Sequence, residues 1–192
     1  MPVSDKKLNE VDAVQNVKDR PHWDIYYLTM AYIVAQRSFD ASSKCGCVIV
    51  SKYNSVLSTG YNGPIKGSID VEIPVTRPEK YCHMLHGEEN ALLAYNGSKQ
   101  DIQEATAYVT GRPCHRCLRM MIQKGITRII HSENPTMCVD QADLDAQEIM
   151  LRHHPEVIML QLDICGVQEL LNNTNEYINH KIELTKEMDN AG

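Results

Sequence analysis

Apolar positions recur along the chain with two different periods. Between residues 22 and 38 they recur every three or four positions, which predicts a helix with one buried face. Residues 45–50 and 56–61 are short, largely apolar runs around a turn at Asn54, a pattern typical of a β-hairpin. Further along, short apolar runs alternate with amphipathic stretches. The predicted strands are 106–110, 127–131 and 157–162, and the predicted helices are 86–95, 114–124, 140–152 and 166–188.

A hairpin followed by alternating strands and helices favours one sheet covered on both faces. We therefore expect an α/β fold, a three-layer α/β/α sandwich with a five-stranded mixed sheet, formed by residues 21–165. Residues 1–20 are predicted to be a polar arm. Residues 166–192 are predicted to form a helix that packs on the domain or on a neighbouring subunit. The long segment 68–80 is expected to be a loop that acts as a lid or a binding loop.

Composition narrows the functional classes. The chain has 192 residues, which fits one domain, and a net charge of −6 without a long basic run. This balance argues against binding to polymeric nucleic acid, although a small anionic substrate needs only a local basic patch. No apolar run is long enough to span a bilayer, and no apolar signal core is present, so we predict a cytoplasmic protein without membrane contact. Seven cysteines, an odd number, fit reduced thiols and metal ligands better than a disulfide framework.

Two short motifs carry candidate chemistry, H-G-E starting at His86 and P-C-H-R-C at residues 113–117. The imidazole of His86 and the thiolates of Cys114 and Cys117 supply three zinc ligands, and a catalytic zinc keeps its fourth position open for water. Glu88, in the first turn of the same predicted helix, can move protons beside that water without binding the metal. Both motifs begin helices, where the positive dipole end favours thiolate over thiol. The combined pattern is that of zinc-dependent nucleobase deaminases.

The chain resembles the cytidine deaminase superfamily, and within it most of all the deoxycytidylate (dCMP) deaminases. The matching segments, in order between Trp23 and His131, are A-Q-R-S, C-G-C-V-I-V, T-G-Y-N-G, the Lys-Tyr pair before the zinc His, H-G-E-E-N-A-L-L, P-C-H-R-C and the following Gly-Ile. The resemblance implies a cytidine deaminase-like fold, hydrolysis of dCMP to dUMP and ammonia in pyrimidine deoxynucleotide metabolism, and a homo-oligomer, either a dimer or a hexamer. It also implies Zn²⁺ as the cofactor and Glu88 as the group that transfers protons when water attacks C4 of the base.

The resemblance also suggests a substrate-binding set. It implies that Asn62 hydrogen-bonds the sugar, and the alternative is that Asn62 only forms a turn. Gly87, where the family usually has Ala, and Thr110 adjoin the motifs and belong to the predicted set, together with Lys80 and Arg112. Four loop cations near the motifs could each contact a 5′-phosphate. They are Lys66, Arg77, Lys80 and Arg112.

The turn that follows Asn62 departs from the family pattern. Here Pro64 comes directly after Gly63, whereas the family places one residue between them. In related enzymes this turn is associated with an effector nucleotide, so Gly63 and Lys66 are candidate effector contacts and allosteric control stays open.

Two other functions remain open at this point. One is deamination of another base, a nucleoside or a 5-modified cytosine nucleotide. The other is a catalytically inactive zinc-binding regulatory protein, against which the intact Glu88 argues, since a structural site has no use for that carboxylate. A second zinc could bind to residues around the first strand and before the zinc His, although buried free thiols are commoner. Its candidate ligands are Cys45, Cys47, Cys82 and His83.

Overall fold

A computed structural model describes residues 20–134 and 139–190, so the predicted arm 1–20 lies almost entirely outside the described residues. Its centre is a five-stranded sheet with strand order β2-β1-β5-β6-β7. The strands are β1 (Gly46–Val50), β2 (Val56–Tyr61), β5 (Thr106–Val109), β6 (Arg128–Ser132) and β7 (Ile158–Leu162). β1 is antiparallel to both β2 and β5, whereas β5, β6 and β7 run parallel. The predicted five-stranded mixed sheet is therefore confirmed.

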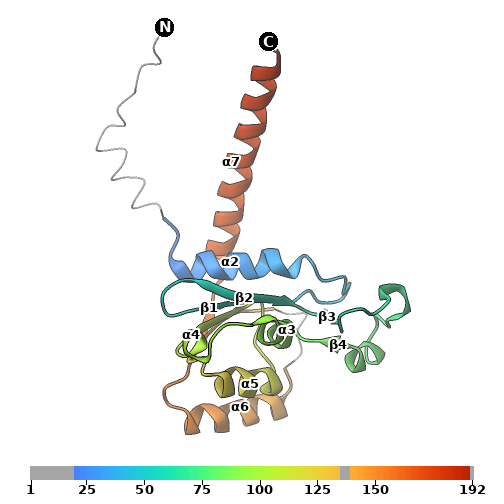
Figure 1. The fold of residues 1–192 in the computed structure, drawn as a ribbon, viewed down its shortest axis with the longest axis vertical. Coiled ribbons are helices and arrows are strands. Elements are labelled where there is room, and N and C mark those ends of the chain that lie inside the picture. The colour runs from blue at the N-terminus through green and yellow to red at the C-terminus, as the bar shows by residue number, and fades with distance from the viewer. Residues whose placement is uncertain (1–19, 135–138, 191–192) are drawn as a thin grey trace.

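Helices cover both faces of this sheet, which confirms the three-layer α/β/α sandwich (Figure 1). One face carries α2 (Trp23–Ala35) and the base of α7 (Cys165–Asn190). The opposite face carries α3 (Gly87–Ala94), α4 (Lys99–Ile102), α5 (His115–Lys124) and α6 (Gln141–His153). Within the described ranges, no helix is long and apolar enough to cross a membrane.

The core lies in two layers, one on each side of β1. Every residue of β1 is buried, which explains why this strand is a continuous apolar run rather than an alternating one. Gly46 allows α2 to approach the strand closely, because a Cβ at this position would lie 2.0 Å from the carbonyl oxygen of Ala31. One core layer packs under α2 and includes Leu28 and Ile130. The other packs under α3 and α5 and includes Ile49 and Leu118.

A polar contact fixes the start of α2 on the sheet. The guanidinium of Arg128 donates two hydrogen bonds of 2.7 Å to Asp24, and the hydroxyl of Tyr108 donates another at 2.9 Å. The hydrogen bonds from Arg128 outweigh burial and lower the pKa of Asp24. Asp24 therefore joins α2 to β5 and β6 as a carboxylate.

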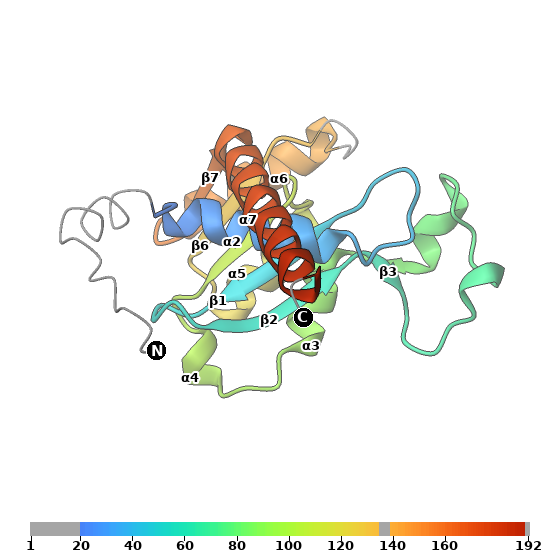
Figure 2. The ribbon, with the colours of Figure 1, turned by 90° about the horizontal axis from the view of Figure 1, so that it is seen from above.

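The loop predicted at 68–80 contains more structure than its composition indicates. The loop is flanked by two short strands, β3 (Gly63–Pro64) and β4 (Met84–Leu85), which pair with each other to form a small sheet. Between these strands, 3₁₀ helices occupy Asp70–Glu72 and Glu79–Cys82. Figure 2 shows this excursion extending beyond the main sheet. Because β4 ends next to His86, the pairing ties the turn after Asn62 to the first residue of the zinc motif.

Among the α7 residues whose side chains are described, those at its base pack on the domain. Val167 is buried, and Leu171 packs with it against the cluster around α2. All residues from Asn172 to Lys186 are exposed, and the helix projects away from the sheet (Figure 1). The predicted terminal helix is therefore present, while its packing on a neighbouring subunit stays a prediction.

Candidate metal centre and active site

Three side chains at the starts of α3 and α5 converge on one point. His86 and Cys114 immediately precede these helices, and Cys117 lies in the first turn of α5. The Nδ1 atom of His86 lies 3.6 Å from the Sγ of Cys114 and 3.4 Å from the Sγ of Cys117. Tetrahedral zinc with normal Zn–N and Zn–S bonds places nitrogen and sulfur about 3.6 Å apart. The donor atoms therefore fit a zinc ion.

These three residues are the only group of this kind in the part of the chain that the structure describes. The four candidate ligands of a second zinc, all of them described residues, do not come together in such a group. Cys45 and Cys47 are buried in the core, and Cys82 is exposed in the 3₁₀ helix before β4. Cys47 is therefore a core thiol, while Cys45 is a buried thiol beside the cluster described below.

The three ligand side chains shift one another's pKa values. Hydrogen bonds from Cys117 and His86 lower the pKa of the Cys114 thiol to about 3, and the contact with Cys114 raises the pKa of His86 to about 9. The hydrogen bond with Cys114 raises the pKa of Cys117. Zinc binds neutral imidazole and thiolates, so its binding at this site displaces the protons that these contacts favour.

Glu88 lies beside this cluster and is 1% exposed. Its Oε2 atom is 4.0 Å from the Sγ of Cys45, and its Oε1 atom has no hydrogen-bond partner. Burial raises the pKa of this carboxyl group. A buried carboxylate oxygen without a partner is costly, so the site suits a ligand that brings a donor to Oε1, such as a water molecule or a protonated ring nitrogen.

Gly87 has a packing reason to be small. α3 lies against the backbone of β2 and of the residue before β1, and a Cβ at Gly87 would lie 3.1 Å from the carbonyl oxygen of Cys45. The contact is closer at Gly60, where a Cβ would lie 2.1 Å from the amide nitrogen of Ala91. The predicted role of Gly87 in substrate binding stays a prediction.

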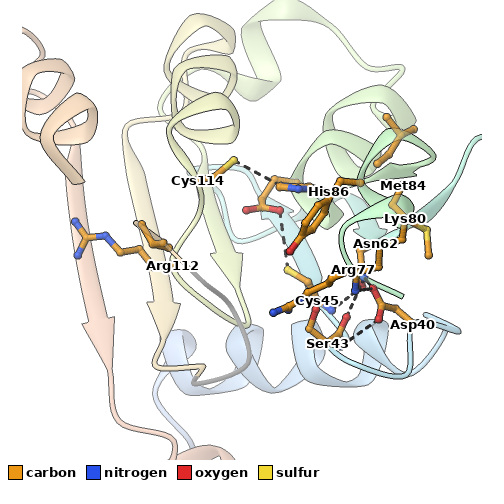
Figure 3. A pocket seen from close by; sticks show the side chains of 14 residues that line it. Asp40, Ser43, Cys45, Asn62, Arg77, Lys80, Met84, His86, Arg112 and Cys114 are labelled. Atoms are coloured by element: carbon orange, nitrogen blue, oxygen red, sulfur yellow. Dashed lines mark hydrogen bonds and ion pairs between the residues drawn. The ribbon is translucent and has the colours of Figure 1, made fainter. Parts of the chain in front are cut away.

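A cavity of about 110 Å³ opens next to the metal ligands (Figure 3). It is lined by Asp40, Ser43, Cys45, Asn62, Arg77, Lys80, Tyr81, Met84, Leu85, His86, Glu88, Arg112, Cys114 and Val139. The sequence motifs located His86, Glu88 and Cys114 but gave no indication of the Asp40 region or of the apolar pair Met84 and Leu85. The Asp40 region reaches the cavity through tertiary contacts, whereas Met84 and Leu85 lie in β4 immediately before His86.

The structure brings three of the predicted substrate residues, Asn62, Lys80 and Arg112, to the cavity and gives each a partner within the protein. Lys80 is 3% exposed, and its Nζ donates to Asp40 Oδ2 at 2.6 Å and to Ser42 Oγ at 2.5 Å. Asn62 accepts from the amide of Cys45 at 2.7 Å and donates to the same Asp40 oxygen at 3.2 Å. Lys80 is therefore a buried ion-pair residue rather than an exposed loop cation, and a substrate contact from either side chain stays a prediction.

The other predicted residues differ in their placement. Thr110 is fully buried, and its hydroxyl accepts from the amide of Gly46 at 3.0 Å. Arg112 lines the cavity, but its guanidinium points away from His86 in Figure 3. The Nε atom of Arg112 donates to Gln147 at 2.9 Å. The candidate effector residues Gly63 and Lys66 lie outside the cavity lining, although Gly63 pairs with Leu85, which belongs to it.

A His-Cys-Cys set of potential metal ligands at two helix starts, with a buried carboxylate beside it on an α/β/α fold, is the arrangement of a zinc-dependent hydrolytic deaminase. The model of the cytidine and deoxycytidylate deaminase zinc-binding region matches residues 21–133, and the chain belongs to this family.

Individual relatives agree with this assignment. The deoxycytidylate deaminase of Homo sapiens is 32% identical over 130 residues, which cover 65% of this chain and 72% of that protein. The deoxycytidylate deaminase of Mycobacterium phage D29 is 36% identical over 129 residues, 58% of this chain and 95% of that protein. The solved dCMP deaminase of cyanophage S-TIM5 in complex with dCMP and dUMP has a TM-score of 0.56 at 22% identity, covering 74% of this chain and 98% of the other. This last likeness supports the fold.

Proposed function

We propose that the protein hydrolyses dCMP to dUMP and ammonia, using zinc held by His86, Cys114 and Cys117. The observation that carries the proposal is Glu88, a buried carboxylate with a raised pKa and an unpartnered oxygen beside the three ligand atoms. The family and the names of the relatives support the substrate. When bound, zinc supplies water with a pKa lowered toward neutrality.

The protein's own groups account for the proton transfers. Glu88 takes a proton from the attacking water, delivers it to N3 of the cytosine ring, and later helps to protonate the departing amino group. Its burial holds the pKa above the ordinary value, which suits a carboxyl group that acts first as base and then as acid. A non-enzymatic zinc protein would leave the buried Oε1 atom without a purpose.

The decisive variant for this mechanism is Glu88→Gln. It keeps the shape of the side chain and does not touch the ligand atoms, so zinc content should equal that of the unchanged protein. Turnover should fall by about 10²–10⁴, the usual contribution of a positioned general acid or base. Near-normal turnover would assign the proton transfers to another group.

Substrate choice depends on the 5′-phosphate. Arg77 and Arg112 line the cavity, and a charge-assisted hydrogen bond from either contributes about 1.5–3 kcal/mol, or about tenfold to a hundredfold in specificity. We expect kcat/KM for dCMP to exceed that for deoxycytidine by at least this factor. Equal values would leave a deaminase of another substrate, and a strong preference for 5-methyl-dCMP would indicate a modified nucleotide.

An effector nucleotide is also part of the proposal. A ligand at Gly63 and Lys66 would act on the β3–β4 pair, which leads directly to His86. Rate curves against dCMP, measured with and without nucleoside triphosphates, test this. Identical curves would show that the altered turn has lost any regulatory role.

We further propose that the protein is a homo-oligomer that uses α7. The apolar residues that pack the base of α7 continue along the same helical face as Tyr177, Ile178 and Ile182, which are exposed. The opposite face carries Glu176 and Glu183, unlike the basic face of a helix that binds an anionic membrane. Light scattering should give at least a dimer for the full chain and a smaller species after removal of residues 172–192. A full-length monomer near 21.8 kDa would contradict the proposal.

A further inference from the structure

Two side chains of α6 contact the segment that carries the metal ligand Cys114. Gln147 and Asp143 lie one helical turn apart and therefore on the same face of α6. Gln147 is completely buried, and both ends of its amide are used. Its Oε1 accepts from the Nε of Arg112 at 2.9 Å, and its Nε2 donates to the carbonyl oxygen of Pro113 at 3.0 Å.

Asp143 makes the matching contacts on the other side of the ligand. Its Oδ1 atom accepts from the backbone amide of His115 at 2.9 Å and pairs with the Nδ1 atom of the His115 ring. The contacts of α6 thus fall on Pro113 and His115, the two residues that flank Cys114. Among the described residues, neither Asp143 nor Gln147 forms a hydrogen bond with a metal-ligand atom.

This arrangement favours one conformation of the segment. Burying an amide is costly unless its donor and its acceptor both form hydrogen bonds. Gln147 forms both bonds only when Arg112 and Pro113 keep their present positions. The peptide groups on both sides of Cys114 are then fixed, and with them the position from which its thiolate points at His86 and Cys117. α6 begins at Gln141, beyond the residues 21–133 that the family model matches, so the contact comes from a part of the chain outside the family's zinc-binding region.

We propose that Gln147 and Asp143 are positioning residues for the metal centre, through which α6 sets the affinity and geometry of the site at Cys114. The inference rests on the proposed zinc site, because a segment is positioned for metal only if metal binds. It assigns a role to two residues that touch neither substrate nor metal. Groups that orient metal ligands typically contribute about 10-fold to 100-fold to metal affinity.

The test uses cobalt(II) in place of zinc, because the visible absorption of a cobalt–thiolate site reports its geometry without any reference to activity. Gln147→Met removes both hydrogen bonds at nearly the same volume. Gln147→Glu keeps the acceptor for Arg112 and removes the donor to Pro113. Asp143→Ala removes the contacts with His115. The matched control is Gln141→Met, an exposed amide on the same helix that donates only to Asp145.

We expect Gln147→Met and Asp143→Ala to bind cobalt and zinc about 10-fold to 100-fold more weakly in competition with a chelator, and to show a shifted cobalt spectrum. Gln141→Met should match the unchanged protein in both measurements. Unchanged affinity and spectrum in the Gln147 and Asp143 variants would overturn the inference and leave the proposed function standing. If Gln147→Met does not fold, the same two measurements on Gln147→Glu and Asp143→Ala test the inference, and weaker metal binding with a shifted spectrum is again the expected result. An unchanged protein that binds neither metal would overturn the proposed zinc centre together with this inference.

Discussion

Replacing Lys80 by Met tests whether this lysine serves the fold or the substrate. The Nζ of Lys80 and the carboxylate of Asp40 are 2.6 Å apart, with 3% and 2% of the side chains exposed. Removing one partner of a buried ion pair leaves the other charge uncompensated and costs about 3–5 kcal/mol. Removing both, as in Lys80→Met with Asp40→Asn, should cost clearly less, because no buried charge remains.

The loss of stability in Lys80→Met can be measured by thermal unfolding. For a chain of this size, 1 kcal/mol corresponds to about 2–4 °C in Tm, so Lys80→Met should lower Tm by about 6–20 °C. The double variant should recover a substantial part of that loss. The reasoning is refuted if Lys80→Met changes Tm by less than about 2 °C while dCMP loses its advantage over deoxycytidine. Lys80 would then be a phosphate contact, as its place in the sequence indicates.

The same ion pair gives a pH dependence. Burial by itself raises the pKa of Asp40, but hydrogen bonds from Lys80 and Ser42 outweigh it, and the pKa lies below the ordinary value of 3.8. A carboxyl group with a lowered folded pKa contributes stability above its unfolded pKa, and this stability is lost as the pH falls through the folded value. The unfolding free energy should therefore fall from about pH 5 downward, and Asp40→Asn should reduce that slope.

Three further outcomes follow from the site and its packing. The purified protein should hold about one zinc per chain in this site, and Cys117→Ala should lose metal and activity together, whereas full activity in a metal-free preparation would contradict the zinc assignment. Gly60→Ala should prevent folding or cost more than about 3 kcal/mol in denaturant unfolding, because its Cβ would lie 2.1 Å from the backbone nitrogen of Ala91. Gly87→Ala should cost about 1 kcal/mol, because its Cβ would meet the Cys45 carbonyl oxygen at 3.1 Å; equal costs for the two glycines would contradict the packing argument.

The parts of this molecule that sequence reasoning predicted are those encoded by local patterns. The apolar periods placed all five strands of the main sheet, and Gly125, with a positive φ, ends α5 where the predicted helix 114–124 ends. The two metal motifs could be assigned to one site from the sequence, because each places its first ligand immediately before a helix. Two helix starts that converge at one end of a sheet bring their ligands together.

The β3–β4 pair could not be found in this way. Its strands have two residues each, too few for a period, and one consists of Gly63 and Pro64, which indicate a turn by composition. The partner strand lies about twenty residues further on, beyond a segment rich in proline and charge. Only the tertiary fold shows that the turn continues as a pairing that ends next to His86.

Long-range polar pairs explain why the predicted phosphate contacts need revision. A lone cation in a loop gives no sign of its partner, and the partner of Lys80 lies 40 residues earlier while that of Arg112 lies 35 residues later. The ammonium of Lys80 is paired with the carboxylate of Asp40. Among the described residues, Arg112 donates only from its Nε atom, to Gln147. A guanidinium can keep one hydrogen bond within the protein and still present other N–H groups in a fork that matches a phosphate. Phosphate recognition at this cavity is therefore expected to depend on Arg112 rather than on Lys80.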